Sequence, residues 1–206
     1  MRHQHLLPFL GTLAAALATD EQIALQCRES APQNAEVTEI AFAGSGCPAG
    51  YAPGHTLSDP STLILPKSGF TAETGKNKSY LDARANCQIL VKLKYPSGWQ
   101  FSVSKADYYG RVQVPEGMTG VSKTTYYFTG DSSDISYNNT IEGPYDGSYF
   151  RNDRFGEKNS LWSPCGSEAM LNINTEVRLS PIGTDQTAVI GVNTQETVEI
   201  SWRTCG

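Results

Sequence analysis

The chain has 206 residues, of which 39% are hydrophobic and 18% charged, and its formal net charge is -5. This length allows one sizeable domain, and the composition differs from that of disordered chains, which are poor in apolar residues and rich in charge. The modest negative charge and the lack of any run of basic residues argue against a nucleic-acid partner or an anionic membrane surface.

The first 18 residues have the pattern of a secretory signal peptide. Arg2 supplies a positive start, residues 6–17 are mostly apolar, and Ala16–Ala18 provides a small-x-small cleavage site. The apolar run is too short to cross a bilayer and no later run is long enough, so we expect no membrane span in the mature chain. The pattern predicts a secreted, extracellular protein. Loss of Arg2 would change the net charge from -5 to -6.

The rest of the chain divides into a polar leader, residues 19–36, and a patterned region, residues 37–206, without a linker-like break. We therefore expect a single domain there. Val37–Ala43 reads as a strand running into a glycine-rich turn, and Thr62–Leu65 is a short apolar run.

The clearest alternation of apolar and polar residues lies on both sides of a turn signal. Cys87–Tyr95 and Trp99–Val103 both alternate, and Pro96–Gly98 separates them. This arrangement predicts a hairpin with one buried face.

Further alternating stretches cover residues 111–114, 119–128, 171–179 and 198–202, with turn signals between them. No long window of the mature chain has the periodicity of a helix. Many short strands separated by turns predict an all-β fold, an antiparallel β-sandwich with little helix.

Five cysteines fit an oxidising compartment, where disulfides are the usual outcome. They are Cys27, Cys47, Cys87, Cys165 and Cys205. Sequence alone leaves the connectivity open, and we favour Cys47–Cys87 and Cys165–Cys205. Each bond would contribute about 4 kcal/mol in the chain-entropy model. Cys27 is then free, paired with another chain, or lost with a propeptide.

Two sequons, Asn77-Lys78-Ser79 and Asn138-Asn139-Thr140, predict N-glycosylation of Asn77 and Asn138. Asn77 lies in a polar loop, and Asn138 lies near an expected strand edge.

Several short motifs occur in an order that resembles one known family. They are Gly44–Gly50 (GSGCPAG), Asn86–Gln88 (NCQ), Tyr95–Phe101 (YPSGWQF), Asp107–Gly110 (DYYG), Tyr126–Gly130 (YYFTG), Gly143–Tyr145 (GPY), Pro164–Gly166 (PCG), Leu171–Arg178 (LNINTEVR) and Trp202–Cys205 (WRTC). In these motifs the chain is similar to the secreted family catalogued as domain of unknown function 4360.

The resemblance covers residues 37–206. It implies secretion, a shared β fold and four cysteines, which match Cys47, Cys87, Cys165 and Cys205. Cys27 departs from the family pattern, which supports its treatment as the unpaired cysteine. The resemblance carries no activity and no catalytic residue.

The chain contains few histidines that could take part in catalysis or bind a metal. Signal cleavage would remove His3 and His5, which leaves His55 in a loop rich in proline and glycine. Neither a copper site with two histidines nor a zinc site with three can then form, so we expect no metal, no cofactor and no catalytic residue.

The segment Glu142–Phe155 (EGPYDGSYFRNDRF) is the candidate binding region, and we expect it to be a loop. Aromatic rings can stack on sugar C–H faces while amides and carboxylates accept hydroxyl hydrogen bonds. The candidate ligand-binding residues are Tyr145, Asp146, Tyr149, Phe150 and Asp153. Alternatively, the segment is a long loop whose aromatic residues fold back onto the sheet.

We therefore predict a secreted, non-enzymatic β-sandwich that binds a glycan or an extracellular protein at a cell wall or host surface. One alternative is a carbohydrate-active hydrolase with a carboxylate pair drawn from Asp107, Glu142, Asp146, Asp153 and Glu168. Another alternative is a structural surface or matrix protein held in an assembly through Cys27.

Overall fold

The computed structural model describes residues 31–47, 56–66, 69–156 and 159–205. The predicted signal peptide and most of the predicted leader lie outside these residues, as do Cys27 and His55.

The described residues form antiparallel strands and no α-helix, because alternating side chains give each strand one face for the core and one for solvent. The strands are β1 (Glu36–Ala43), β2 (Thr56–Asp59), β3 (Thr62–Pro66), β4 (Phe70–Thr74), β5 (Arg84–Val114), β6 (Thr119–Phe128), β7 (Asp134–Glu142), β8 (Tyr145–Arg154), β9 (Gly166–Ser180) and β10 (Ala188–Thr204).

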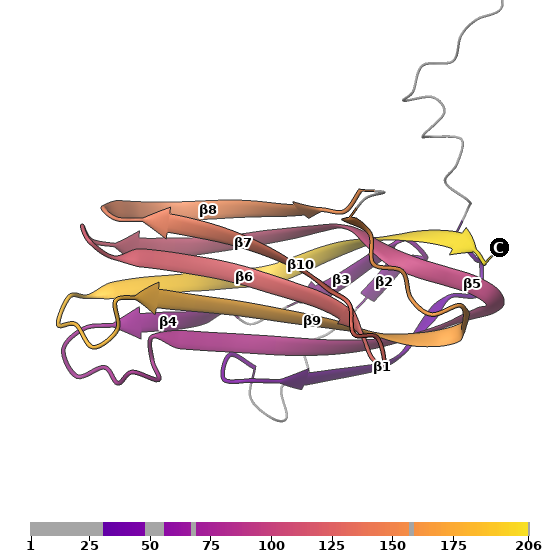
Figure 1. Ribbon diagram of the computed structural model, residues 1–206, viewed down its shortest axis with the longest axis horizontal. Helices are drawn as coiled ribbons and strands as arrows, with labels where there is room; N and C mark the ends of the chain where they lie inside the picture. Colours follow the sequence, from indigo (N-terminus) through magenta and orange to yellow (C-terminus); the bar gives the residue numbers. More distant parts are fainter. Residues whose placement is uncertain (1–30, 48–55, 67–68, 157–158, 206) are drawn as a thin grey trace, which may run out of the picture.

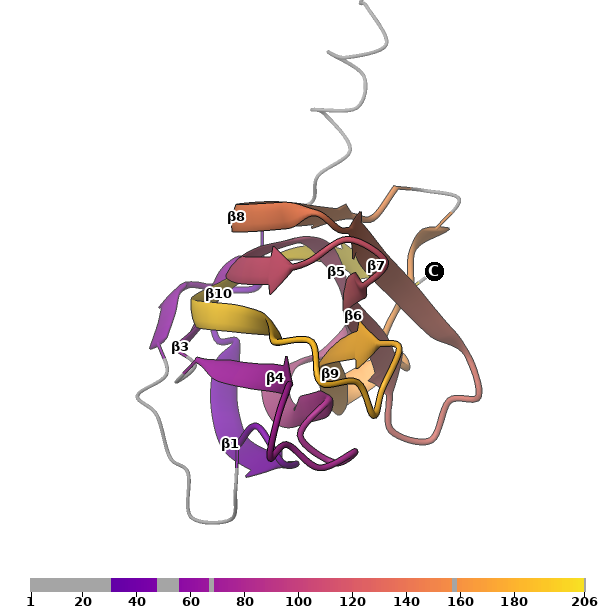
Figure 2. The ribbon, with the colours of Figure 1, turned by 90° about the vertical axis from the view of Figure 1, so that its left-hand side faces the viewer.

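All ten strands belong to one sheet, in the order β2-β3-β10-β5-β9-β6-β7, with β1 and β8 also paired to β5 and β4 paired to β10. The first part of the 31-residue β5 pairs with β1 and β9, and its last part pairs with β10 and β8. Figure 1 shows β5 turning back near the C-terminus. The sheet therefore curls, and its two halves face each other around the core (Figure 2).

The predicted hairpin of Cys87–Tyr95 with Trp99–Val103 is wrong. Both stretches belong to β5, and they pair with β9 and β10 respectively. Gly98 adopts a φ of 86° at the bend, a conformation that glycine takes without steric cost. A bent strand that passes from one half of the sheet to the other has the same turn signal as a hairpin.

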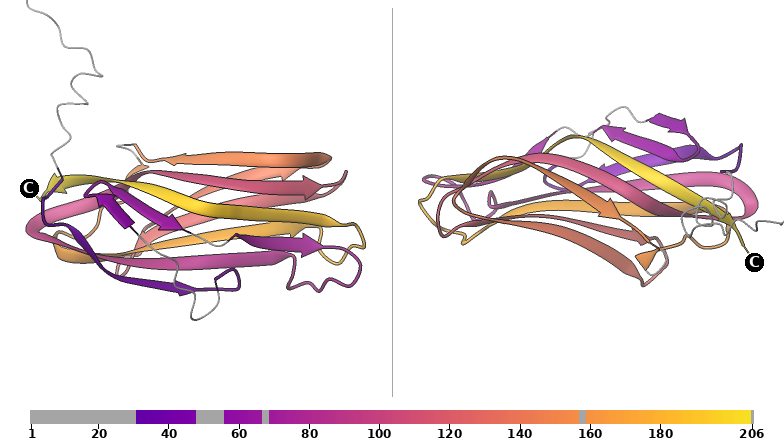
Figure 3. Two further views of the ribbon diagram at one scale, coloured as in Figure 1. Left: turned by 180° about the vertical axis from the view of Figure 1, so that it is seen from behind. Right: turned by 90° about the horizontal axis from the view of Figure 1, so that it is seen from above.

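The predicted all-β, antiparallel, disulfide-bonded fold is confirmed. Its core is closely packed and rich in aromatic residues. Tyr95, Phe101, Phe128 and Trp202 make edge-on or tilted contacts there, with ring centroids 5.1–5.7 Å apart. In the view from behind, β10 runs along the length of the molecule (Figure 3). Strands β3 and β4 pair with β10, and β2 pairs with β3.

The two disulfides join Cys47 to Cys87 and Cys165 to Cys205, the pairing favoured from the sequence. Both cysteines of the first are buried in the core cluster. The second disulfide lies at the end of the molecule where β5 bends. There the Cys205 N–H also donates a hydrogen bond to the Gly98 carbonyl, at 2.8 Å.

Replacing Gly110 with Ala is expected to destabilise the fold by about 1–3 kcal/mol, the usual cost of overpacking. A Cβ atom at Gly110 would lie 2.2 Å from the Gly191 carbonyl oxygen and 2.4 Å from the Tyr149 ring. Chemical denaturation measures the loss. Gly156→Ala is the control, because a Cβ atom there would meet nothing within 4 Å and the substitution should be nearly neutral. Gly117→Ala is less suitable because Gly117 has a positive φ. Equal effects of Gly110→Ala and Gly156→Ala would contradict this packing account.

Candidate functional site

The predicted loop over Glu142–Phe155 is wrong in its main part, because Tyr145–Arg154 forms strand β8. The strand pairs in register with the last part of β5, from Tyr145 opposite Val114 to Arg154 opposite Lys105. The alternation was hard to recognise because Arg151 and Asp153, on the inward face, are charged and yet buried.

The structure divides the five candidate residues between two faces of β8. Asp146 and Phe150 point to solvent, whereas Tyr149 and Asp153 are buried on the inner face. Tyr145, 41% exposed, lies at the end of the strand, where its hydroxyl donates to the Ser148 carbonyl at 2.9 Å. The residues that an external ligand can reach are therefore Tyr145, Asp146 and Phe150.

Phe150 forms an exposed aromatic pair with Tyr109 of β5. The two residues are direct cross-strand partners, their ring centroids are 4.9 Å apart, and the rings are tilted by 39°. They remain 53% and 52% exposed, respectively. Together they form an apolar strip on the solvent face of β5 and β8, which we call the aromatic platform.

Polar side chains on the same face border the aromatic platform on both sides. Toward one end of the strands, Arg111 donates to Asp146 at 2.9 Å. Toward the other end, Asn152 donates to Asp107, its direct cross-strand partner. Side chains on one face repeat about every 7 Å along a strand, so these groups lie next to the rings.

Lys105 ties Asp107 to the neighbouring strand β10. Its ammonium group lies 2.9 Å from Asp107 and 3.1 Å from Glu199. The hydrogen bonds to Asp107 and Glu199 raise the pKa of Lys105 above its usual value. The polar border is thus a set of charged and amide groups that hold one another in place.

Sequence reasoning did not identify Tyr109 or Arg111 as part of a binding surface, and it considered Asp107 only as a carboxylate of the hydrolase alternative. A signal was present, because residues 105, 107, 109, 111 and 113 alternate with buried positions, and Tyr109 is the aromatic member of this otherwise polar series. A single exposed ring is common on protein surfaces, so this signal becomes informative only when a second ring lies beside it, as Phe150 does here.

The inner face of β8 holds a buried ion pair. Arg151 Nε lies 2.8 Å from Asp153 Oδ1, and the two side chains are 7% and 0% exposed. Arg151 also donates to the Ser122 carbonyl at 2.8 Å, and Tyr126 donates to Asp153 at 2.8 Å. Burial, the largest single influence, lowers the pKa of Arg151, but the charge of Asp153 and the nearby tyrosines outweigh it and raise the pKa.

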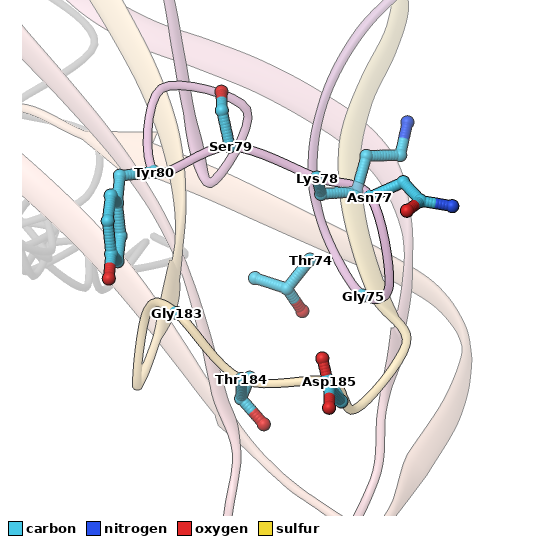
Figure 4. A pocket seen from close by; sticks show the side chains of 9 residues that line it. All are labelled: Thr74, Gly75, Asn77, Lys78, Ser79, Tyr80, Gly183, Thr184 and Asp185. Atoms are coloured by element: carbon cyan, nitrogen blue, oxygen red, sulfur yellow. The ribbon is translucent and has the colours of Figure 1, made fainter.

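A shallow pocket of about 420 Å³ lies between the loops that precede β5 and β10 (Figure 4). The Tyr80 ring packs against Gly183 there. Asn77 and Lys78 point away from the pocket (Figure 4), and Thr74 is already bonded to the Gln186 carbonyl. The pocket therefore offers few free polar groups that converge on one ligand.

The candidate carboxylates of the hydrolase alternative lie in different places. Asp107 and Asp146 border the aromatic platform, Asp153 is in the core, Glu142 ends β7, and Glu168 on β9 pairs with Lys92 at 3.2 Å. In the described part of the chain, no group of three or more His, Cys, Asp or Glu side chains is placed to hold a metal ion. Among the same residues, no helix could span a membrane.

The comparisons with known proteins concern nearly the whole described chain. The family model "Domain of unknown function (DUF4360)" matches residues 33–205. A protein of Arthroderma benhamiae, named "Uncharacterized secreted protein", is 37% identical over 175 residues, which are 84% of this chain and 69% of that protein. This relative confirms the predicted secretion.

Similarities to solved structures were also found. TmCBM61 in complex with a β-linked galactotriose has 8% identity and a TM-score of 0.30, over 81% of this chain and 89% of that chain. The enzymatically active domain of tailspike protein 4 from bacteriophage CBA120 has 10% identity and a TM-score of 0.22, over 82% of this chain and 18% of that chain. Both TM-scores are too low to indicate a shared fold.

Proposed function

The chain belongs to the family of the domain of unknown function DUF4360, and we propose that this secreted protein binds a glycan of a cell wall or host surface through the aromatic platform, without catalysis. The observation that carries the proposal is the exposed pair of Tyr109 and Phe150 rings on a strand face bordered by fixed polar groups.

A sugar ring presents an apolar C–H face and a rim of hydroxyl groups. The tilted rings of Tyr109 and Phe150 offer a complementary apolar surface. Arg111 and Asn152 can donate to hydroxyl oxygens, while Asp107 and Asp146 can accept from hydroxyl groups. The strands fix the backbone positions of these groups, and Asp107 is also held by Asn152 and Lys105, which lowers the conformational entropy lost on binding.

The size of the apolar strip favours a glycan over a protein partner. A fully covered aromatic side chain buries about 150–250 Å², so two half-exposed rings offer about 200 Å². Each partner in a standard protein interface contributes about 800 Å² with an apolar centre. The platform is therefore too small for the centre of such an interface, and it suits one or two sugar rings.

Phe150→Ala and Tyr109→Ala are each expected to weaken glycan binding roughly thirtyfold. Covering the exposed half of either ring, about 100 Å², stabilises the complex by about 2 kcal/mol. Calorimetry would measure the affinity of the secreted protein for soluble oligosaccharides of β-glucan, chitin, mannan and galactan, chosen after a glycan array. Tyr80→Ala is the matched control, because Tyr80 is 69% exposed but lies away from the platform.

Two results would overturn the proposal. One is the absence of binding to every glycan tested, and the other is glycan binding that persists in the Tyr109→Ala/Phe150→Ala double variant. Release of shorter saccharides during the same incubations would favour the hydrolase interpretation instead.

A further inference from the structure

Strand β7 is a margin of the curled sheet. It pairs with β6 along its whole length, from Asp134 opposite Tyr127 to Glu142 opposite Thr119. Among the described residues, no strand pairs with its other side. A free strand edge presents unpaired N–H and C=O groups to which another chain can add as an extra strand.

The composition of β7 offers little protection against such addition. Its charges, Asp134 and Glu142, stand at the two ends, and the seven residues between them (ISYNNTI) contain neither charge nor proline. Uncharged segments with isoleucine, tyrosine and threonine are the kind that pair between chains. Another edge strand, β8, differs because Arg151 and Asp153 point inward, a known device that blocks strand addition.

The sequon of Asn138 lies at the centre of this uncharged part of β7. Asn138 and Thr140 are both exposed, and because they are two residues apart they project from the same face. In the described part of the chain the Asn138 side chain makes no hydrogen bond. Because the side chain is exposed, an attached saccharide would break no side-chain hydrogen bond of the described residues.

We propose that Asn138 carries an N-linked glycan that shields the free edge of β7 from pairing with other chains. In the transfer step, the Asn138 amide nitrogen bonds to the anomeric carbon of an oligosaccharide carried on a lipid pyrophosphate. The bond between that carbon and the pyrophosphate oxygen breaks, the amide nitrogen loses one proton, and the lipid pyrophosphate leaves. The relative from Arthroderma benhamiae is named as a secreted protein, and passage through a eukaryotic secretory route exposes a chain to such donors.

A hydrated saccharide at Asn138 starts on the outer face of β7 and is large enough to extend over its edge, where it would hinder the approach of a second strand. The other sequon provides the comparison. Asn77, with a φ of 70°, lies in the exposed turn between β4 and β5, beside the shallow pocket and not on β7. A glycan at Asn77 leaves the edge of β7 uncovered.

The test uses the full chain secreted from a eukaryotic host that performs N-glycosylation. Peptide mapping before and after peptide-N-glycosidase treatment measures occupancy at each sequon. Light scattering during incubation of the concentrated protein then compares Asn138→Gln, Thr140→Ala and the control Asn77→Gly, because glycine tolerates the φ of 70° at this position. Asn138→Lys also lacks the glycan but adds a charge that opposes strand addition. It therefore tests whether aggregation results from an exposed strand edge or only from loss of the Asn138 amide.

We expect Asn138 to be occupied and Asn138→Gln and Thr140→Ala to aggregate several-fold faster than wild type. Asn77→Gly should aggregate at the wild-type rate, and Asn138→Lys should aggregate more slowly than Asn138→Gln. Far-UV circular dichroism and the denaturation midpoint confirm that each variant folds. An unmodified Asn138, or equal aggregation of folded Asn138→Gln and Asn77→Gly, would overturn the proposal.

Discussion

Replacing Arg151 with Met is expected to lower the free energy of unfolding by about 3–5 kcal/mol. The substitution leaves Asp153, which is 0% exposed, as a buried carboxylate without its cationic partner. It also removes the donors to Ser122 and the guanidinium group that lies 4.2 Å above the Tyr108 ring. Denaturant titration, followed by intrinsic fluorescence, measures the loss.

A second variant separates the charge from the packing. In Arg151→Met/Asp153→Asn both charges are gone, and the asparagine oxygen can still accept from Tyr126. We expect this double variant to be more stable than Arg151→Met alone, because breaking a buried ion pair costs more than replacing it entirely. If the two substitutions instead add as independent losses, the ion pair does not act as a coupled unit.

Removal of either disulfide is expected to cost about 4 kcal/mol, because both close a loop with a sequence separation of 40. The structure predicts that the two disulfides differ in how much stability their removal costs beyond this equal entropic contribution. Cys47 and Cys87 are each 1% exposed in the core, whereas Cys165 is exposed. Cys47→Ala/Cys87→Ala should therefore lose about 1 kcal/mol more, since it also leaves a cavity.

Equilibrium denaturation of the two double variants tests this order of stability. Both variants and their reference carry Cys27→Ser, which prevents thiol exchange. An equal loss for both pairs would show that loop closure alone accounts for the stabilisation. A larger loss for Cys165→Ala/Cys205→Ala would contradict the expected role of core burial.

The candidate site was only partly predictable. Composition singled out the segment that contains Asp146 and Phe150, because it mixes aromatic rings with polar groups. It could not identify Tyr109, whose contact with Phe150 depends on the register between β5 and β8. It also could not separate the exposed Phe150 from the buried Tyr149, because the charged residues at the inward positions obscured the alternation.

The sequence by itself determined that the protein is all-β, and its alternating side chains located most of the strands, including Cys87–Tyr95 and Leu171–Leu179. Alternation specifies which face of a strand is buried, because that property is local. The tertiary structure decided which strands are neighbours, since backbone hydrogen bonds are nearly the same for every residue and do not select a partner. The bend of β5, the burial of Arg151 with Asp153, and the pairing of Tyr109 with Phe150 all follow from that long-range choice.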